Sequence, residues 1–170
     1  MNRRRFLLLL AGAGAVAAGF GLVRFWRGRD ERQIRRRVAR LCELFAKTGG
    51  ESELISLARA SEIAQSLAEG FRIELGAPFR EHIADRDQLR IAIHQVRSHA
   101  DHIAVAILDH TIVIDEGAAR AESELAVRVR ADAGGEADSE MRRFNLAWMK
   151  EDRTWRISAV RPADTIEGPR

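Results

Sequence analysis

The sequence lacks several features that would otherwise direct its interpretation. It has one cysteine, Cys42, so an internal disulfide bond is excluded and the thiol is expected to pack in the core. Three prolines and the lack of any long Ser/Gly tract argue against flexible linkers. No acidic residue precedes Asp30. What remains, at 46% apolar and 31% charged residues, has the composition of a folded domain behind a basic, apolar N-terminus.

That N-terminus has the charge pattern of a membrane segment. Three arginines precede an uncharged run over residues 6–23, which would rise roughly 27 Å as a helix, close to the hydrocarbon thickness of a bilayer. The positions expected at the membrane are Phe6, Leu10, Val23 and Trp26. The pattern predicts a single uncleaved anchor over residues 1–29, with membrane lipid as a partner.

Two other interpretations of this segment remain open. The run Arg3-Arg4-Arg5-Phe6-Leu7 resembles a twin-arginine export signal, with two arginines, one spacer and two apolar residues, and cleavage at residues 15–17 would release the domain. The third alternative is a cytosolic protein. Arginines follow the apolar run, so the positive-inside rule alone places the domain in the cytoplasm, although folded domains cross largely regardless of charge. We expect a bacterial inner-membrane protein, single-pass, with its domain on the periplasmic side, or an exported one.

The charge of the folded part disfavours nucleic acid as a partner. Six of the 28 basic residues lie before residue 30 and none of the 25 acidic residues does, so the remainder carries a small acidic excess. A glycine-rich stretch over residues 12–19 has no preceding strand and the wrong glycine spacing for a dinucleotide loop. We therefore expect no cofactor.

Three helices are predicted in the first half of the domain, over residues 30–47, 52–69 with a break near residue 60, and 85 or 87 to 100. Leu89, Ala92, Ile93 and Val96 are expected to form the buried stripe of the third. Arg32, Arg36 and Arg40 form a stripe on the first helix. This stripe is interpreted either as a solvated face or as a contact with anionic lipid.

Strands are predicted over residues 71–75, 103–109, 111–115, 118–131, 140–150 and 154–162, with a loop at 132–139. The two segments around Asp109 and His110 form either one bent strand or a pair. Because the strands follow one another along the chain, we expect a meander in an α+β fold. A curved antiparallel sheet wrapped by three helices would make a cone-shaped, cystatin-like roll over residues 30–163, with residues 164–170 as a tail.

The element order, together with Phe144, Leu146, Trp148 and the Trp155-Arg156-Ile157 segment after a charged hairpin, resembles the nuclear transport factor 2-like superfamily over residues 32–163. That superfamily includes SnoaL-like cyclases and ketosteroid isomerases. The resemblance implies the cone fold and, in the enzymes, an Asp or His that projects into the cone. The chain has no tyrosine, so an isomerase-type oxyanion hole with Tyr cannot form.

Asp109 and His110 are the weak catalytic candidates, because they interrupt an apolar strand run. Adjacent strand residues point to opposite faces, so both could enter the cone only at a bulge, and a turn is the preferred interpretation. His94, His99 and His102 lack the spacing and further ligand that zinc requires, so no metal site is expected.

The expected pocket lining combines apolar and polar positions from one helix and three strands, namely Phe71, Leu89, Ile93, Arg143, Phe144, Asn145, Leu146, Trp148 and Trp155. Two alternatives remain open for it. Arg143 and Asn145 lie either on the solvent face of their strand or in a pocket as polar anchors. Trp148 and Trp155 are either core residues or flat walls for an apolar ligand.

Two hypotheses for function follow. The first is a membrane-tethered extracytoplasmic domain without catalysis, which binds a small apolar ligand, a protein partner or a second copy of itself. The alternative is a SnoaL-like cyclase, isomerase or hydrolase that uses a cone-facing Asp or His.

Overall fold

The computed structural model describes residues 28–74, 82–115 and 117–163. The expected membrane segment at residues 6–23 and the tail at 164–170 lie outside the described residues. Among the helices that are described, none is both long enough and apolar enough to cross a membrane.

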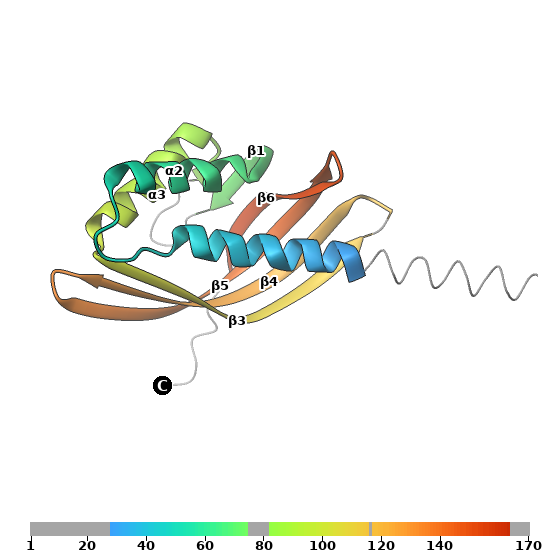
Figure 1. Ribbon diagram of the computed structural model, residues 1–170. Helices are drawn as coiled ribbons and strands as arrows, with labels where there is room; N and C mark the ends of the chain where they lie inside the picture. The colour runs from blue at the N-terminus through green and yellow to red at the C-terminus, as the bar shows by residue number, and fades with distance from the viewer. Residues whose placement is uncertain (1–27, 75–81, 116, 164–170) are drawn as a thin grey trace, which may run out of the picture.

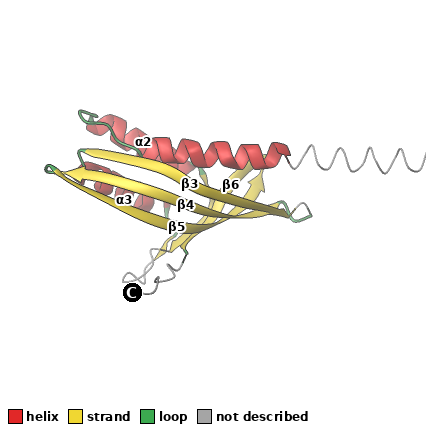
Figure 2. Cartoon of the chain, turned by 90° about the horizontal axis from the view of Figure 1, so that it is seen from below, coloured by secondary structure: helices red, strands yellow, loops and turns green. Residues whose placement is uncertain are grey.

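The fold is α+β, with helices and strands in the order expected for a cone. The elements are a helix over residues 28–45, called here the N-terminal helix, then α2 (Glu53–Gln65), β1 (Leu67–Glu74), β2 (His82–Ile83), α3 (Arg86–His99), β3 (His102–Asp115), β4 (Arg120–Ala133), β5 (Glu136–Glu151) and β6 (Thr154–Pro162). The strands form one sheet in the order β2-β1-β6-β5-β4-β3. Figure 1 shows the three helices over one face of the curved sheet, and Figure 2 shows its other face free of helices.

The sheet is mixed, which corrects the expectation of a purely antiparallel one. Strand β6 pairs antiparallel with β5 on one side and parallel with β1 on the other. The meander β3-β4-β5-β6 therefore ends by docking its last strand beside the first. This closure brings the early helices over the late strands, because β1 follows α2 directly in the chain.

The first strand begins earlier than the pattern predicts. Helix α2 starts at the predicted N-cap, Ser52, whose hydroxyl accepts the N–H of Ile55, and it continues without a break at residue 60. It ends at Gln65, because Ser66 turns its N–H and hydroxyl toward the Ile63 carbonyl. Leu67 is then buried as the start of a strand, although it satisfies the spacing of a helix face as well.

The expected loop at residues 132–139 is a two-residue turn instead. Strand β4 runs to Ala133, β5 begins at Glu136, and Gly134 and Gly135 between them have φ of 59° and 89°. Two adjacent positive φ values match a type I′ turn, whose twist suits a hairpin. The two long strands therefore stay paired to their tips.

Helix α3 buries a charged residue where an apolar one was expected. Asp85 caps the helix by accepting the N–H of Gln88. Leu89 and Ile93 are buried as predicted, but Val96 is 54% exposed and Arg97 is fully buried. The buried stripe of α3 is therefore Leu89, Ile93 and Arg97, at intervals of four residues. The Arg97 guanidinium reaches the carbonyls at the C-terminal end of the N-terminal helix.

Candidate functional site

The interior between helices and sheet is filled by large side chains. Trp148, Trp155 and Phe71 are at most 2% exposed. Trp148 donates its indole N–H to the Ser123 hydroxyl at 2.9 Å, which satisfies the polar atom that burial would otherwise leave unpaired. The tryptophans are therefore core residues that pack against the helices.

A bulge in β3 decides which of the two catalytic candidates faces inward. The β3–β4 register skips one residue between Ile107 and Asp109, which makes Leu108 the extra residue. Before the bulge Ile103 is buried, and after it His110 is buried at 8% exposure while Asp109 is exposed. The interpretation of Asp109 and His110 as a turn is therefore wrong. They lie within one bent strand, and only His110 enters the interior.

His110 lies beneath the N-terminal helix. Its carbonyl accepts from Arg35 Nη1 at 2.9 Å, and its N–H donates to Asp109 Oδ1 at 2.8 Å. Burial, and next the Arg35 charge, lower the pKa of His110, while the Asp109 and Glu31 carboxylates oppose that shift. Its Nε2 is buried without a hydrogen-bond partner among the described residues. The ring is thus a neutral imidazole at neutral pH.

The other residues expected to line a pocket divide between the two faces of the sheet. The buried ones are Phe71, Leu89, Ile93, Leu146, Trp148 and Trp155, and Phe144 is half-buried against them. Arg143 and Asn145 are exposed, because they alternate with Phe144 and Leu146 along β5. The structure therefore does not bring Arg143 or Asn145 together with the tryptophans.

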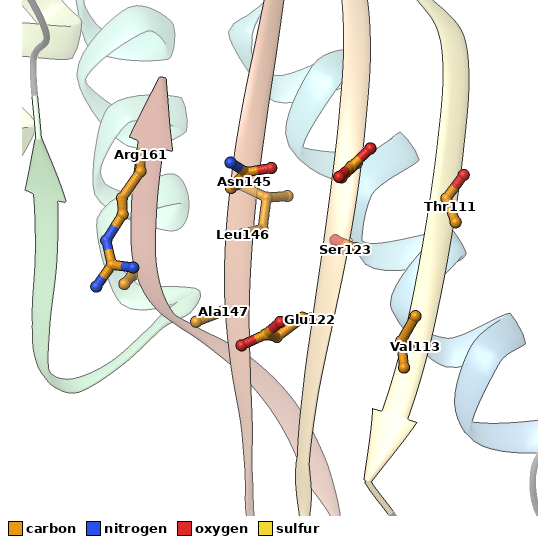
Figure 3. A pocket seen from close by; sticks show the side chains of 10 residues that line it. Thr111, Val113, Glu122, Ser123, Asn145, Leu146, Ala147 and Arg161 are labelled. Atoms are coloured by element: carbon orange, nitrogen blue, oxygen red, sulfur yellow. The ribbon is translucent and has the colours of Figure 1, made fainter. Parts of the chain in front are cut away.

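The outer face of the sheet carries a hollow of about 400 Å³ that spans β3 to β6. Figure 3 looks onto this face with the helices behind the sheet. Its lining is Thr111, Val113, Glu122, Ser123, Glu124, Asn145, Leu146, Ala147, Ala159 and Arg161. Of these, Arg161 forms an ion pair with Glu74 at 3.2 Å. We call this hollow and the exposed side chains around it the outer face.

A second and larger hollow, of about 1010 Å³, lies between the N-terminal helix and the β5–β6 turn. We call it the basic groove, and its lining is Arg29, Asp30, Arg32, Gln33, Arg36, Arg37, Arg40, Lys150 and Arg153. Lys150 is held by Asp30, with both carboxylate oxygens at 2.8 Å. The predicted arginine stripe thus forms one wall of a groove whose other wall comes from residues more than a hundred positions away.

A third hollow, of about 260 Å³, lies next to the basic groove, between the N-terminal helix and α2. It shares Arg37 and Arg40 with the groove, and Leu41, Leu44, Trp148 and Ile157 give it an apolar floor. We call it the apolar notch. His110 lines none of these three hollows.

The histidines that invited a metal interpretation do not converge. His94 lies 3.7 Å from Glu53, His99 contacts the Gln95 carbonyl, and His102 accepts the Gly49 N–H. Within the described ranges, no three His, Cys, Asp or Glu side chains gather as metal ligands.

The sequence shows which side chains face solvent, but not how they combine on the two outer surfaces. Alternation along β4 puts Glu122, Glu124 and Arg128 on its solvent-facing side. Lys150 and Arg153 could not be joined to the arginine stripe from the sequence, because only the closure of the sheet brings the β5–β6 turn to the N-terminal helix.

Comparison with known proteins identifies the fold. No family model matches the chain, and no curated protein matches it in sequence. A putative scytalone dehydratase from Novosphingobium aromaticivorans superposes with a TM-score of 0.65 at 13% identity, over 85% of this chain and 91% of its own. An NTF2-like protein with a cystatin-like fold from the same organism gives 0.64 at 16% identity, over 91% and 90%. A Kribbella flavida protein gives 0.66 at 14% identity, over 81% and 91%. At these identities the likeness shows the fold alone, and the fold is NTF2-like.

Proposed function

We propose that the chain is a binding domain without catalysis, tethered to the bacterial inner membrane on its periplasmic side, whose protein partner is a second copy of itself. The observation that carries this proposal is the position of the hollows relative to the core. Large side chains fill the interior, and the three hollows lie on outer surfaces. A small apolar ligand inside the cone is correspondingly less favoured.

The charges of the outer face support self-association. Glu122 and Glu124 lie on β4 toward one end of this face, and Arg128 lies four residues beyond Glu124 on the same strand. Arg143 is opposite Ala126 on β5, and it adds to the basic end. Within the described part of the chain, none of these four side chains forms an ion pair. Each end of the face is therefore open to charges of the opposite sign.

This charge arrangement is complementary to itself. A two-fold axis that lies in the plane of the face and crosses β4 at Leu125 would lay the acidic end of one copy on the basic end of the other, with Arg143 at the level of Glu124 of its partner. This is the geometry of an isologous dimer. Val113 and Met141, which are 68% and 64% exposed, would supply apolar contacts beside the charges. Charge complementarity of this kind sets partner choice and orientation.

Mixing of charge-reversed variants tests the proposal. We expect a dimer of the full chain in nonionic detergent by sedimentation, after subtraction of bound detergent. Glu122→Arg with Glu124→Arg in one variant, and Arg128→Glu with Arg143→Glu in another, should each be monomeric. Their mixture should restore a dimer with one copy of each. A monomeric wild type, or variants that dimerise alone, would contradict the proposal.

The tether needs its own test. Membrane fractionation with N-terminal sequencing should find the chain in the membrane with residue 1 or 2 at its start. A soluble protein that starts near Ala18 would show a removed signal instead.

A second candidate function, that of an enzyme, has one observation in its favour. The bulge in β3 turns His110 inward, and its Nε2 is buried without a partner in the described structure. An imidazole so placed is a candidate general base. Because one structural neighbour is named as a putative scytalone dehydratase, dehydration of scytalone is the reaction to assay. Turnover that His110→Gln abolishes would favour the enzyme. No turnover removes this neighbour's reaction from consideration.

A further inference from the structure

The basic groove contains more positive charge than the fold neutralises. Arg32, Arg36, Arg37 and Arg153 all line it, and within the described residues none of them forms an ion pair. Its one lining carboxylate, Asp30, is already held by Lys150. Four guanidiniums that face one hollow without counter-charges repel one another, so an anion in the groove would be stabilised by all of them.

Two further details indicate that these charges are held in place at a cost. Burial, and next the Arg156 charge, lower the pKa of Arg37, so its surroundings disfavour a cation. Arg153 has φ of 65°, in the left-handed region that favours glycine, and its predecessor Asp152 has φ of 46°. A type I′ hairpin turn would accept Asp-Gly there with less strain. A bulky cation at the second turn position therefore has a use other than folding.

The apolar notch indicates what kind of anion fits. Arg37 and Arg40 line both the groove and the notch, and the notch has apolar lining from Leu41, Leu44, Trp148 and Ile157. Its other polar lining is Gln65, Ser66, Arg156 and Glu62, and the Glu62 carboxylate is paired with Arg40. A site with cations at its mouth and apolar side chains beyond them matches a ligand with an anionic head and a hydrocarbon tail. The notch, at about 260 Å³, is below the usual range for a whole drug-sized ligand, roughly 300–1,000 Å³, so it suits the first segment of a chain.

We infer that the basic groove and the apolar notch together bind an anionic phospholipid, with its phosphate against Arg36 and Arg37 and the start of its acyl chain in the notch. The groove starts at Arg29, six residues after the apolar run ends at Val23. A tethered domain would thus hold this groove beside the headgroups. The inference deepens the proposed function by giving the tethered domain a lipid ligand, although the binding itself does not need the tether.

The experiment measures ligand-induced thermal stabilisation of the full chain in nonionic detergent. The probes are dihexanoyl phosphatidylglycerol, its zwitterionic phosphatidylcholine counterpart, glycerol 3-phosphate and a short single-stranded oligonucleotide. We expect the anionic lipid to raise Tm with saturation, because a ligand that binds only the native state stabilises it. Glycerol 3-phosphate has the head without the tail, so it should bind more weakly.

Variants connect the effect to the groove. Arg36→Gln with Arg37→Gln should weaken the apparent affinity for the anionic lipid by about tenfold or more, since each guanidinium–phosphate contact is a charge-assisted bond. Arg128→Gln with Arg143→Gln removes the same charge from the outer face and should leave the affinity unchanged. Arg36→Lys with Arg37→Lys should fall between the wild type and the glutamine variant, because lysine keeps the charge without the planar fork. Circular dichroism of each variant establishes that it is folded.

Several results would overturn the inference. If glycerol 3-phosphate binds as well as the lipid, the site takes a free phosphate and the notch plays no part. If the oligonucleotide binds more tightly than the lipid, the groove is a nucleic-acid site. If the outer-face variant loses as much affinity as the groove variant, the attraction is non-specific. None of these results affects the outcome of membrane fractionation, so a failure of the lipid-binding inference can be distinguished from a failure of the proposed membrane tether.

Discussion

Two clusters of arginine lie at opposite ends of the N-terminal helix, and they differ in how their charges are satisfied. At its C-terminal end, Arg97 is fully buried and each of its three guanidinium nitrogens has a hydrogen-bond acceptor. In the basic groove beside its first three turns, Arg32, Arg36 and Arg37 face a hollow and have no carboxylate partner in the described structure. Arginine thus joins secondary-structure elements in the Arg97 cluster, whereas in the basic groove it is available to bind an anionic ligand.

The buried cluster is a helix cap built from the tertiary structure. Arg97 Nη1 donates to the carbonyls of Leu44, Phe45 and Ala46 at 2.6–2.8 Å, where the N-terminal helix ends and its carbonyls lack helical partners. Arg97 Nη2 bonds the buried carboxylate of Glu51, and Arg97 Nε donates to Ser56. A cation at this end of a helix also complements its dipole. One side chain therefore fixes three helices relative to one another.

The partner carboxylate shows how complete this pairing is. Glu51 has a side chain only 3% exposed, and its second oxygen lies 3.1 Å from Arg59 Nη1. Arg59 Nη1 donates its hydrogen bond to the Ala46 carbonyl. Its contact with the second Glu51 oxygen is therefore an ion pair without a hydrogen bond. Each oxygen of the buried carboxylate therefore has its own cation. In the basic groove, by contrast, the guanidiniums of Arg32, Arg36 and Arg37 face a hollow without a described carboxylate partner.

The largest expected effect is therefore the loss of Arg97. Arg97→Met keeps most of the volume, yet it leaves Glu51 buried beside a single cation and the Leu44 and Phe45 carbonyls without their side-chain donor. The free energy of unfolding should fall by about 3–5 kcal/mol, the usual penalty for removing one partner of a buried ion pair. Urea denaturation followed by tryptophan fluorescence measures it. A loss of under about 1 kcal/mol would show that this cluster is as loosely coupled as a surface pair.

A double-mutant cycle checks that the penalty comes from the pair. Glu51→Gln with Arg97→Met should be less destabilising than the sum of the two single changes, because the second change no longer strands a charge. Additive values would place the effect in the carbonyl contacts alone.

These clusters also show which parts of the molecule could be predicted from the sequence. Periodicity predicted α3, with Asp85 or Asp87 as its cap, because Leu89 and Ile93 repeat at helix spacing; the structure has Asp85 as the cap. It could not predict that Arg97 would be the next buried residue, since that depends on where the first helix ends. In β4, strict alternation of apolar and polar residues already indicates that Leu125 and Val127 share one face, and both are buried. The bulge at Leu108 was beyond such reasoning, because an extra residue in an apolar run leaves the composition of both faces unchanged.

The site was less predictable than the fold for a related reason. The arginine stripe is visible along one helix, but a groove needs a second wall, and that wall comes from a turn between the last two strands. Alternation along β5 separates Arg143 and Asn145 from Trp148 without any structure. It cannot say whether the face that they share is covered, because nothing in the strand itself specifies its neighbours.

The second prediction concerns the turn that supplies this wall. Arg153→Gly removes a side chain from a left-handed position and should raise the free energy of unfolding by about 1 kcal/mol, at the lower end of the range for such strain. Chemical denaturation in the absence of lipid measures it. If the comparison between the clusters holds, the same variant binds the anionic lipid more weakly while being more stable. A destabilised variant would show that Arg153 serves the fold after all.

The third prediction reverses the Arg97 result in the groove. Arg37→Gln should change the free energy of unfolding by no more than about 0.5 kcal/mol, because no described carboxylate loses a partner. The wild type should gain stability as salt is added from low ionic strength, since screening relieves the repulsion between Arg37 and Arg156. The Arg37→Gln variant should gain less. Equal salt slopes would mean that the repulsion in the groove is already relieved within the protein.

The smallest expected effect comes from His110, which lies between the two situations, buried and beside one cation. Its folded-state pKa is lowered below the ordinary value of 6.5, first by burial and next by Arg35. Above that ordinary value the ring is neutral in both states and contributes its full stability. As the pH falls below 6.5, the unfolded chain takes up the proton first, so stability declines until the folded-state pKa is passed.

In His110→Phe this part of the decline should vanish, whereas the four other histidines remain as an internal control. Thermal denaturation of both proteins from about pH 7.5 to about pH 5 measures the difference. Parallel curves would mean that the buried ring accepts its proton as readily as an exposed one. The charge of Arg35 would then be neutralised by Glu31, 2.8 Å away, and would not act on His110.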